Sequence, residues 1–284
     1  MLRVTERPSL YDNLEQKTVM ELITAINAED MKVAPAIREA LPALEKLIAA
    51  VERQLRNGGR MFYLGCGSGG RLAVLDSIEL PNTYGIEKGV MNVVLAGGVD
   101  RLVEAPEEKE DEEDDGWKDL LRENVSPADI VIGISASGTT PYVFSGLKWC
   151  QEHRIPCGSI VHNPNSPISE HSDYPVEIVM GPEFVTGSTR MKCGTAQKIV
   201  FDMISTTVLI RLGHVAGNRM VDVRLTNKKV IDRSVRMILE LSGLENYDKA
   251  HDILLQCGSV RKSVDYIKPV SYTHLRAHET DQYL

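Results

Sequence analysis

The sequence contains no hydrophobic run long enough to cross a membrane. Its longest apolar stretches have the length of β-strands, and the first residues, Met1 to Arg7, lack the apolar segment of a secretory signal peptide. These absences predict a cytoplasmic protein without a membrane partner. The hydrophobic fraction of 43% in 284 residues is still sufficient for a full buried core.

Cysteine clusters and a positive charge balance are also missing. The chain has five cysteines, an odd number, and none of them has the close spacing of a zinc site. They are Cys66, Cys150, Cys157, Cys193 and Cys257. We therefore expect reduced thiols that serve mainly in packing, with no disulfide framework and no metal. The formal net charge of -8, with a dense acidic run from Glu107 to Asp115, argues against general binding to nucleic acid.

Five short apolar runs are present, separated for the most part by helical patterns. They cover residues 60–65, 92–96, 129–134, 157–161 and 176–180. Buried strands that alternate with helices predict the α/β class with a parallel sheet.

Helical patterns flank these runs on both sides. Before them, a helical region from about residue 16 to residue 57 ends at Gly58-Gly59. Its apolar residues at helical spacing are Ile37, Leu41, Leu44, Leu47, Ile48 and Val51. After the runs, residues 191–212 are apolar on nearly every side, which indicates a buried helix. That helix is buried either in the core or at an interface between subunits, and the pattern does not separate the two.

A glycine-rich turn, Gly65-Cys66-Gly67-Ser68-Gly69-Gly70-Arg71, follows the first apolar run. Glycines let the backbone approach a phosphate, a helix start near Arg71 directs free N–H groups at it, and Ser68 adds a hydroxyl donor. The turn also fits G-x-G-x-x-G, so a dinucleotide site is an alternative. The second run ends in Gly97-Gly98 and lacks the acidic residue that would bind a ribose. A simple phosphate site is therefore favoured.

A second loop of the same kind follows the third apolar run. Its sequence is Ser135-Ala136-Ser137-Gly138-Thr139-Thr140-Pro141, and Pro141 is a favoured first residue of a helix. Two loops that are rich in donors, each between a strand and a helix, predict one phosphorylated ligand.

These loops resemble motifs of the N-acetylmuramic acid 6-phosphate etherases. The glycine turn is similar to G-x-G-T-S-G-R, and Ser137 to Val143 resembles S-G-R-T-P-Y-V. Gly187 to Lys198 is similar to G-S-T-R-x-K-A-G-T-A-Q-K, and Met220-Val221-Asp222 with Thr226-Asn227 matches M-V-D…T-N. The resemblance covers residues 4 to 268.

The resemblance implies a sugar isomerase (SIS) fold, in which helices flank a five-stranded parallel sheet, and a homodimer. It also implies cleavage of the lactyl ether at C3 of N-acetylmuramic acid 6-phosphate to N-acetylglucosamine 6-phosphate and D-lactate, without a metal or a nucleotide cofactor. A base removes the C2 proton of the open-chain aldehyde, lactate leaves with help from an acid, and water adds to the unsaturated aldehyde. Two carboxyl groups with separated pKa values suit this chemistry.

The family's two catalytic glutamates fall on Glu79 and Glu110. We expect Glu79 to be the acid at the departing lactate oxygen, and Glu110 to be the base at C2 or for the entering water. The residues alone leave other interpretations open. Glu79 is otherwise an ordinary exposed helix carboxylate, and Glu110 is otherwise part of a solvated acidic face.

A sugar phosphate is the expected ligand, with Ser68, Ser137 and Thr140 around the phosphate. The whole expected binding set is Gly67, Ser68, Ser137, Gly138, Thr139, Thr140, Glu183, Ser188, Thr189 and Lys192. Alternatives remain for four of them. Ser188 and Thr189 are otherwise helix caps. Lys192 is otherwise a cation at a helix start that pairs with acidic residues of the surface, and Glu183 is otherwise an ordinary carboxylate in a turn.

Five positions depart from the family pattern. Ser68 replaces a threonine, Gly69 a serine, Asn82 a proline, Ser135 an alanine and Thr139 an arginine. The change at Thr139 removes a cation, and the change at Gly69 removes a hydroxyl that could contact phosphate or sugar. These departures bear on the identity of the substrate more than on the fold.

Two other functions are open: a non-catalytic sugar-phosphate sensor similar to glucokinase regulatory protein, and a sugar-phosphate isomerase of the SIS type. The retained Glu79 and Glu110 favour the etherase over the sensor. An isomerase commonly has a histidine or glutamate base near the second loop, and no histidine occurs in it.

Four regions are expected along the chain. Residues 1–57 form a helical region, 58–225 the SIS domain that binds the sugar phosphate, and 226–268 the start of a truncated helical C-terminal domain. Residues 269–284 resemble translated adapter sequence and are interpreted as a foreign tail, in which the metal-like spacing of His274 and His278 is chance.

Overall fold

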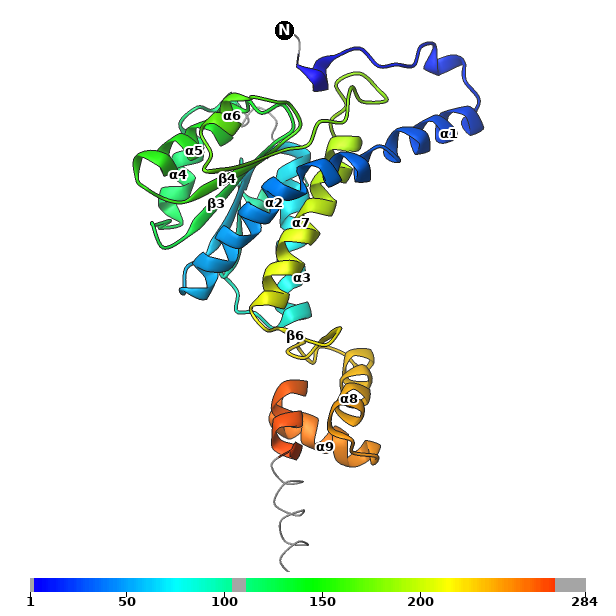
Figure 1. The fold of residues 1–284 in the computed structure, drawn as a ribbon, viewed down its shortest axis with the longest axis vertical. Helices are drawn as coiled ribbons and strands as arrows, with labels where there is room; N and C mark the ends of the chain where they lie inside the picture. The colour runs from blue at the N-terminus through cyan, green and yellow to red at the C-terminus, as the bar shows by residue number, and fades with distance from the viewer. Residues whose placement is uncertain (1–2, 104–110, 269–284) are drawn as a thin grey trace, which may run out of the picture. The chain divides into compact units, whose positions relative to one another are not determined.

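The computed structural model describes residues 3–103 and 111–268 and is drawn in Figure 1. The chain divides into two compact units. The first contains the residues up to 78 together with 89–208, and the second contains 79–88 and the residues from 209 onward. The division falls within two helices, after Ile78 and after Val208. The domain boundaries expected at 57/58 and 225/226 stay predictions, and the tail with His274 and His278 lies outside the described residues.

The first unit is built on a parallel sheet of five strands in the order β2-β1-β3-β4-β5. The strands are β1 (Met61–Gly65), β2 (Met91–Leu95), β3 (Ile130–Ser135), β4 (Cys157–Val161) and β5 (Tyr174–Glu177). Every residue of β1, β3 and β4 is buried. Parallel strands covered on both faces have continuous apolar sequences, which is why five apolar runs could predict them. The predicted α/β class with a five-stranded parallel sheet is confirmed.

The fifth strand begins and ends earlier than the apolar run at 176–180. It includes Pro175, which is exposed. Proline cannot donate to a ladder of hydrogen bonds, so it normally argues against a strand. β5 is an edge strand of the sheet, and an edge strand tolerates a residue that lacks the backbone N–H donor.

Helices cover both faces of this sheet. In chain order they are α1 (Val19–Asp30), α2 (Val33–Arg56), α3 (Gly67–Tyr84), α4 (Asp115–Arg122), α5 (Pro141–Glu152), α6 (Pro167–Glu170) and α7 (Lys192–Arg211). Figure 1 shows α4 and α5 on one side of the sheet and α2, α3 and α7 on the other. α2 buries Ile37, Leu44, Leu47 and Val51, as predicted. Leu41 lies off this face and is 43% exposed.

Helix α7 is the long apolar helix predicted at 191–212. It buries Val200, Phe201, Ile204 and Val208, and the ring of Phe201 lies 4.9 Å from that of Tyr63 in β1. Most of its apolar surface is therefore in the core of the chain itself. Ile210 near its end is exposed.

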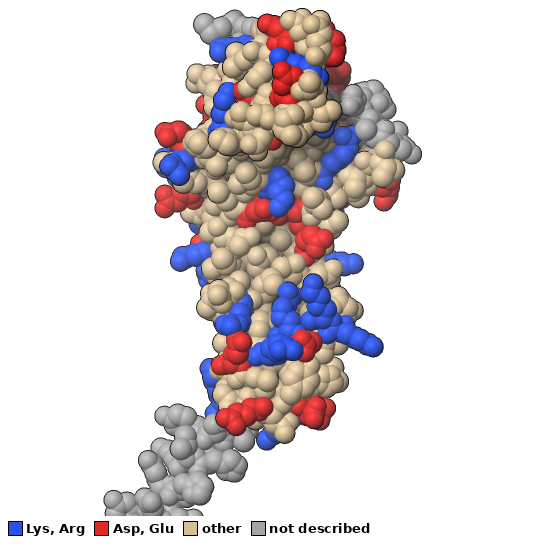
Figure 2. Space-filling view, turned by 90° about the vertical axis from the view of Figure 1, so that its right-hand side faces the viewer, with Lys and Arg blue, Asp and Glu red and all other residues tan. Residues whose placement is uncertain are grey.

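The second unit has its own apolar core. It contains a short hairpin of β6 (Val215–Ala216) and β7 (Arg219–Met220), then α8 (Lys228–Ser242), α9 (Tyr247–Cys257) and helical residues 260–268. Its buried residues include Val235, Ile238, Leu254 and Val260. Figure 2 shows Lys and Arg side chains gathered over one side of this unit. The exposed residues Lys229, Arg233 and Arg236 recur on one face of α8.

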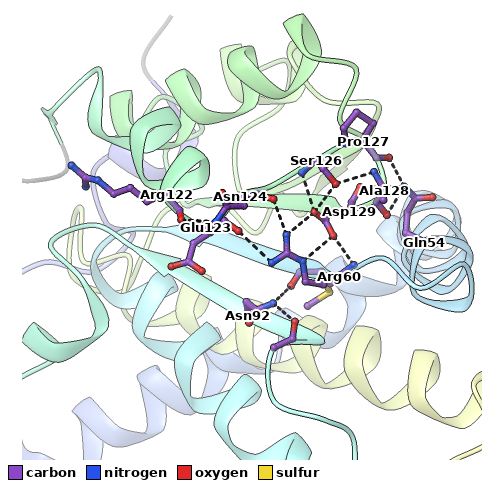
Figure 3. Close-up of polar contacts among 12 residues, drawn as sticks. Gln54, Arg60, Asn92, Arg122, Glu123, Asn124, Ser126, Pro127, Ala128 and Asp129 are labelled. Carbon is purple, nitrogen blue, oxygen red and sulfur yellow. Dashed lines mark hydrogen bonds and ion pairs between the residues drawn. The ribbon is translucent and has the colours of Figure 1, made fainter.

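The amino ends of β1 and β3 are joined by an ion pair (Figure 3). Arg60 Nη2 lies 2.9 Å from Asp129 Oδ2, and the Asp129 side chain is 3% exposed. Asp129 also accepts the backbone N–H groups of Arg60 and Ser126. Burial opposes its charge, but these bonds outweigh burial and lower the pKa of Asp129. The Gln54 amide donates to the carbonyls of residues 127–129, which fixes the turn before β3.

Candidate functional site

The glycine turn and the hydroxyl-rich loop lie side by side at the carboxyl edge of the sheet. β1 and β3 are neighbours, with Gly65 opposite Ile134. A Cβ atom placed on Gly69 would lie 2.9 Å from Ile134 Cγ2 and 3.0 Å from Oε1 of the buried Gln197 in α7. The structure therefore brings the two predicted phosphate loops together, and α7 reaches the same place.

The glycine turn forms the first turn of α3. The helix begins at Gly67, earlier than the predicted start near Arg71, because the Gly70 N–H already donates to the Cys66 carbonyl at 2.9 Å. The amides of Gly67, Ser68 and Gly69 precede the first intrahelical donor, so the helix offers N–H groups to an anion here. Gly67 has a φ of 51°, in the left-handed region that glycine adopts easily.

The second loop is held by its own hydroxyl groups. Ser135 Oγ accepts the Gly138 N–H at 3.0 Å and lies 2.8 Å from Thr140 Oγ1. Ser137 Oγ accepts the N–H of Thr139 at 3.3 Å and its hydroxyl at 3.2 Å. Thr140 precedes Pro141, the first residue of α5, as predicted. The Ser137 and Thr139 side chains are partly exposed at the start of α5.

A third strand ends at the same edge, and its polar residues were not singled out from the sequence. β4 is followed by His162 and Asn163, both buried. The His162 ring is paired with the Ile178 carbonyl at 3.0 Å through Nδ1, and burial lowers the pKa of His162 to about 4, so the ring is neutral. Asn163 contacts the second loop. The sequence feature that could have identified these two residues is a polar pair directly after the fourth apolar run.

Glu183 caps α7. Its carboxylate accepts the backbone N–H groups of Lys192 and Cys193 at 3.0 and 2.9 Å. A carboxylate at a helix N-terminus is favoured by the helix dipole. Ser188 and Thr189, the other capping candidates, are half-buried in the loop before α7 and make backbone contacts there.

Lys192 is buried in a charge network. Its Nζ lies 2.5 Å from Glu29 Oε2, and both side chains are 2–3% exposed. Glu29 also binds Lys32 at 2.6 Å and the Tyr11 hydroxyl at 3.0 Å. Burial alone would raise the pKa of Glu29, yet these donors hold it at about 2. The structure thus shows protein partners for Lys192 and Glu183, residues for which the sequence predicted ligand contacts.

Glu79 lies far along α3 from the glycine turn. Twelve residues separate it from Gly67, which corresponds to a rise of about 18 Å along the helix. Glu79 is exposed. Leu75, four residues before it on the same helix surface, is 49% exposed, and Ile78 is 59% exposed. Glu79 belongs to the second unit, and the two loops belong to the first.

Glu110 lies outside the described residues. Glu113, three residues later, lines a groove of about 940 Å³ together with Thr139 of the second loop. The groove is walled by aromatic and apolar side chains of α4 and α5, among them Trp117, Phe144 and Trp149.

Two further observations concern the described residues as a whole. Among them, no three His, Cys, Asp or Glu side chains come together as a metal ion would need. No helix in the described ranges combines the length and hydrophobicity needed to cross a bilayer.

Comparison with known protein families gives two matches. Residues 43–151 match the glucokinase regulatory protein N-terminal SIS domain, and residues 110–207 match the SIS domain. Among solved structures, a phosphoheptose isomerase from Francisella tularensis is similar with a TM-score of 0.53 at 15% identity, covering 68% of this chain and 98% of that one. A protein from E. coli CFT073 gives a TM-score of 0.52 at 17% identity, covering 71% and 97%. These neighbours confirm the SIS-type fold.

Curated relatives are much more similar in sequence. The N-acetylmuramic acid 6-phosphate etherase of Bacteroides fragilis is 48% identical over 267 residues, which are 94% of this chain and 95% of that protein. The enzyme of the same name from Porphyromonas gingivalis is 47% identical over 94% of this chain and 97% of its own length. That from Yersinia pestis is 39% identical over 95% and 89%.

Proposed function

This chain belongs to the N-acetylmuramic acid 6-phosphate etherase family, and on that premise we propose that it is a carbon–oxygen lyase that acts on N-acetylmuramic acid 6-phosphate. The lactyl ether at C3 is cleaved by elimination of D-lactate, and water then adds to give N-acetylglucosamine 6-phosphate. The reaction takes place in the cytoplasm and uses no cofactor. The relatives carry the etherase name, so the sensor and the isomerase are not favoured.

One observation carries this proposal: two donor-rich loops meet at one edge of the sheet. The α3 amides at Gly67 and Ser68 and the hydroxyls of Ser137 and Thr140 supply donors suited to a phosphate. The substrate lies with its 6-phosphate between the loops, and Gly138 and Thr139 contact it from the start of α5. Glu183, Ser188 and Thr189 border it from the segment before α7, and Lys192 borders it from the start of α7.

The chemistry requires a base at C2 and an acid at the departing lactate oxygen. In this proposal Glu110 removes the C2 proton, and Glu79 protonates the departing lactate oxygen. Glu110 lies outside the described residues, and its role as the base rests on the match to the family's catalytic glutamate.

We propose that two copies of the chain build each site. Glu79 follows the glycine turn by about 18 Å along α3, which is much longer than a hexose phosphate, and this separation supports a contribution of Glu79 to the site of another copy. The exposed Leu75 and Ile78 beside it form an apolar surface suited to a subunit contact. A homodimer that buries this surface brings Glu79 of one copy to the loops of the other.

The direct test is incubation with N-acetylmuramic acid 6-phosphate and an assay for D-lactate. Glu110→Gln is expected to abolish exchange of the C2 proton with deuterated water, whereas Glu79→Gln keeps exchange and slows lactate release by roughly a hundredfold or more. Parental turnover in both variants would refute the mechanism.

A mixing experiment tests the shared site. Glu79→Gln and Glu110→Gln homodimers are each inactive, but exchange of subunits gives heterodimers with one intact site. About a quarter of the parental activity is expected after random exchange if Glu79 acts across the dimer. No recovery, with exchange verified by mass, would place both glutamates in one chain.

A further inference from the structure

The N-terminal segment before α1 is docked on the loops of the site. Val4 and Thr5 are 7% and 1% exposed, although only a single short helical turn is formed there. Burial of a segment with so little regular structure requires contacts that tie it down. Thr5 supplies those contacts.

Thr5 and Asn163 are joined by two hydrogen bonds. The Asn163 amide donates to Thr5 Oγ1 at 2.9 Å, and its carbonyl oxygen accepts the Thr5 N–H at 3.3 Å. The same amide group donates to the carbonyls of Ala136 and Ser137, each at 3.1 Å. Asn163 is 4% exposed, so these bonds are shielded from water. One side chain thus links the N-terminal segment to the second loop.

The bonds to Ala136 and Ser137 orient the loop. The N–H of a trans peptide points away from its C=O, so a carbonyl held toward Asn163 turns the following N–H to the opposite side. The Ala136 carbonyl therefore sets the direction of the Ser137 N–H. Asn163 fixes this peptide directly before the residues proposed to bind phosphate.

The segment is also attached to the loop that carries Glu183. Ser9 Oγ donates to the Phe184 carbonyl at 2.6 Å, and the Ser9 N–H donates to Thr186 Oγ1 at 2.9 Å. The rings of Tyr11 and Phe184 lie 4.9 Å apart. These contacts hold residues 9–11 without touching the second loop.

We propose that Asn163 is a positioning residue for the phosphate loop and that Thr5 completes its hydrogen bonding, so that the N-terminal segment sets the affinity for the phosphosugar. This inference rests on the proposed function of the second loop. The Asn163 amide has two N–H groups and three acceptors, so loss of the Thr5 hydroxyl frees both N–H groups to turn to the two loop carbonyls, and the amide shifts relative to the loop.

The test compares Thr5→Val, which keeps the shape and removes the hydroxyl, with Thr5→Ser, which keeps the hydroxyl. Binding of N-acetylglucosamine 6-phosphate is measured by calorimetry, and KM and kcat are measured for the etherase reaction. Thr5→Val is expected to weaken binding about fivefold and to raise KM in parallel, with kcat nearly unchanged. Thr5→Ser restores both values.

Ser9→Ala is the matched control, because it removes a hydrogen bond between the same segment and the other loop. It is expected to leave phosphosugar affinity unchanged. Parental affinity in Thr5→Val, or equal weakening in Ser9→Ala, overturns the inference. Ser137→Ala separates the two proposals: if it weakens binding while Thr5→Val does not, only the positioning role fails. If Ser137→Ala also binds normally, the phosphate loop itself is wrongly assigned.

Discussion

The glycine turn and the hydroxyl loop sit on neighbouring strands but keep their shapes by different means. The glycine turn depends on close packing: a Cβ on Gly70 would lie 2.4 Å from Leu95 Cδ1 and 2.9 Å from the Gly65 carbonyl carbon. The hydroxyl loop depends on hydrogen bonds from Ser135, Ser137 and Asn163. The glycine turn should therefore be disrupted by substitutions that add side-chain atoms, and the hydroxyl loop by substitutions that remove hydrogen-bonding groups.

The largest effect is expected from Gly70→Ala. The added methyl group meets the backbone of Gly65, which cannot move aside without disturbing β1, so we expect a loss of about 3 kcal/mol and of phosphosugar binding. Gly67→Ala is the control, because nothing lies within 4 Å of its Cβ position and only its positive φ opposes the change. Urea denaturation measures both. Equal losses in the two variants would contradict the packing argument.

Two buried carboxyl groups also differ in their response to pH. Burial is the chief cause that raises the pKa of Asp76, nine residues after Gly67 in α3, to about 6. Ser205 donates to it at 2.9 Å, Asp202 and Lys198 of α7 act on it, and Tyr63 of β1 faces it. The folded state then holds the proton more tightly than the unfolded state. The stabilisation is full below about pH 4 and is lost as pH rises through about 6.

Asp76→Asn should therefore stabilise the protein above pH 7, by about 2 kcal/mol, and remove this pH dependence. Thermal unfolding between pH 4 and pH 8 is the measurement. Asp129 is the opposite case, since its pKa is lowered. Asp129→Asn should destabilise near neutral pH, and the deficit should shrink as pH falls. A parental pH profile in Asp76→Asn would show that the buried carboxyl does not titrate as described.

The smallest effect is expected in the hydroxyl loop. Ser135→Ala removes the acceptor of the Gly138 N–H and should cost about 1 kcal/mol and raise KM about fivefold. Ser172→Ala, which removes a bond to the Ile168 carbonyl on α6, is the control and should leave KM unchanged. An unchanged KM for Ser135→Ala would mean that the other bonds hold the loop by themselves.

The sheet could be predicted because buried parallel strands have distinctive apolar runs, and the two loops because each follows such a run. The contacts that join segments far apart in the sequence could not be predicted. Lys192 and Glu29 are 163 positions apart, and Thr5 and Asn163 are 158 apart, so no local pattern links them. The exposure of Leu41 could not be predicted either, since a helical repeat of apolar residues does not define the width of the buried face.

Arg60 and Asp129 hold β1 and β3 together at the edge opposite the two loops. The two strands are thus tied by a charge pair at one end, while the ligand loops begin at the other end. A substitution in a loop that leaves the packing of Gly65 against Gly70 intact does not touch this pair. Ligand preference can therefore be altered from the loops without a change at the base of the sheet.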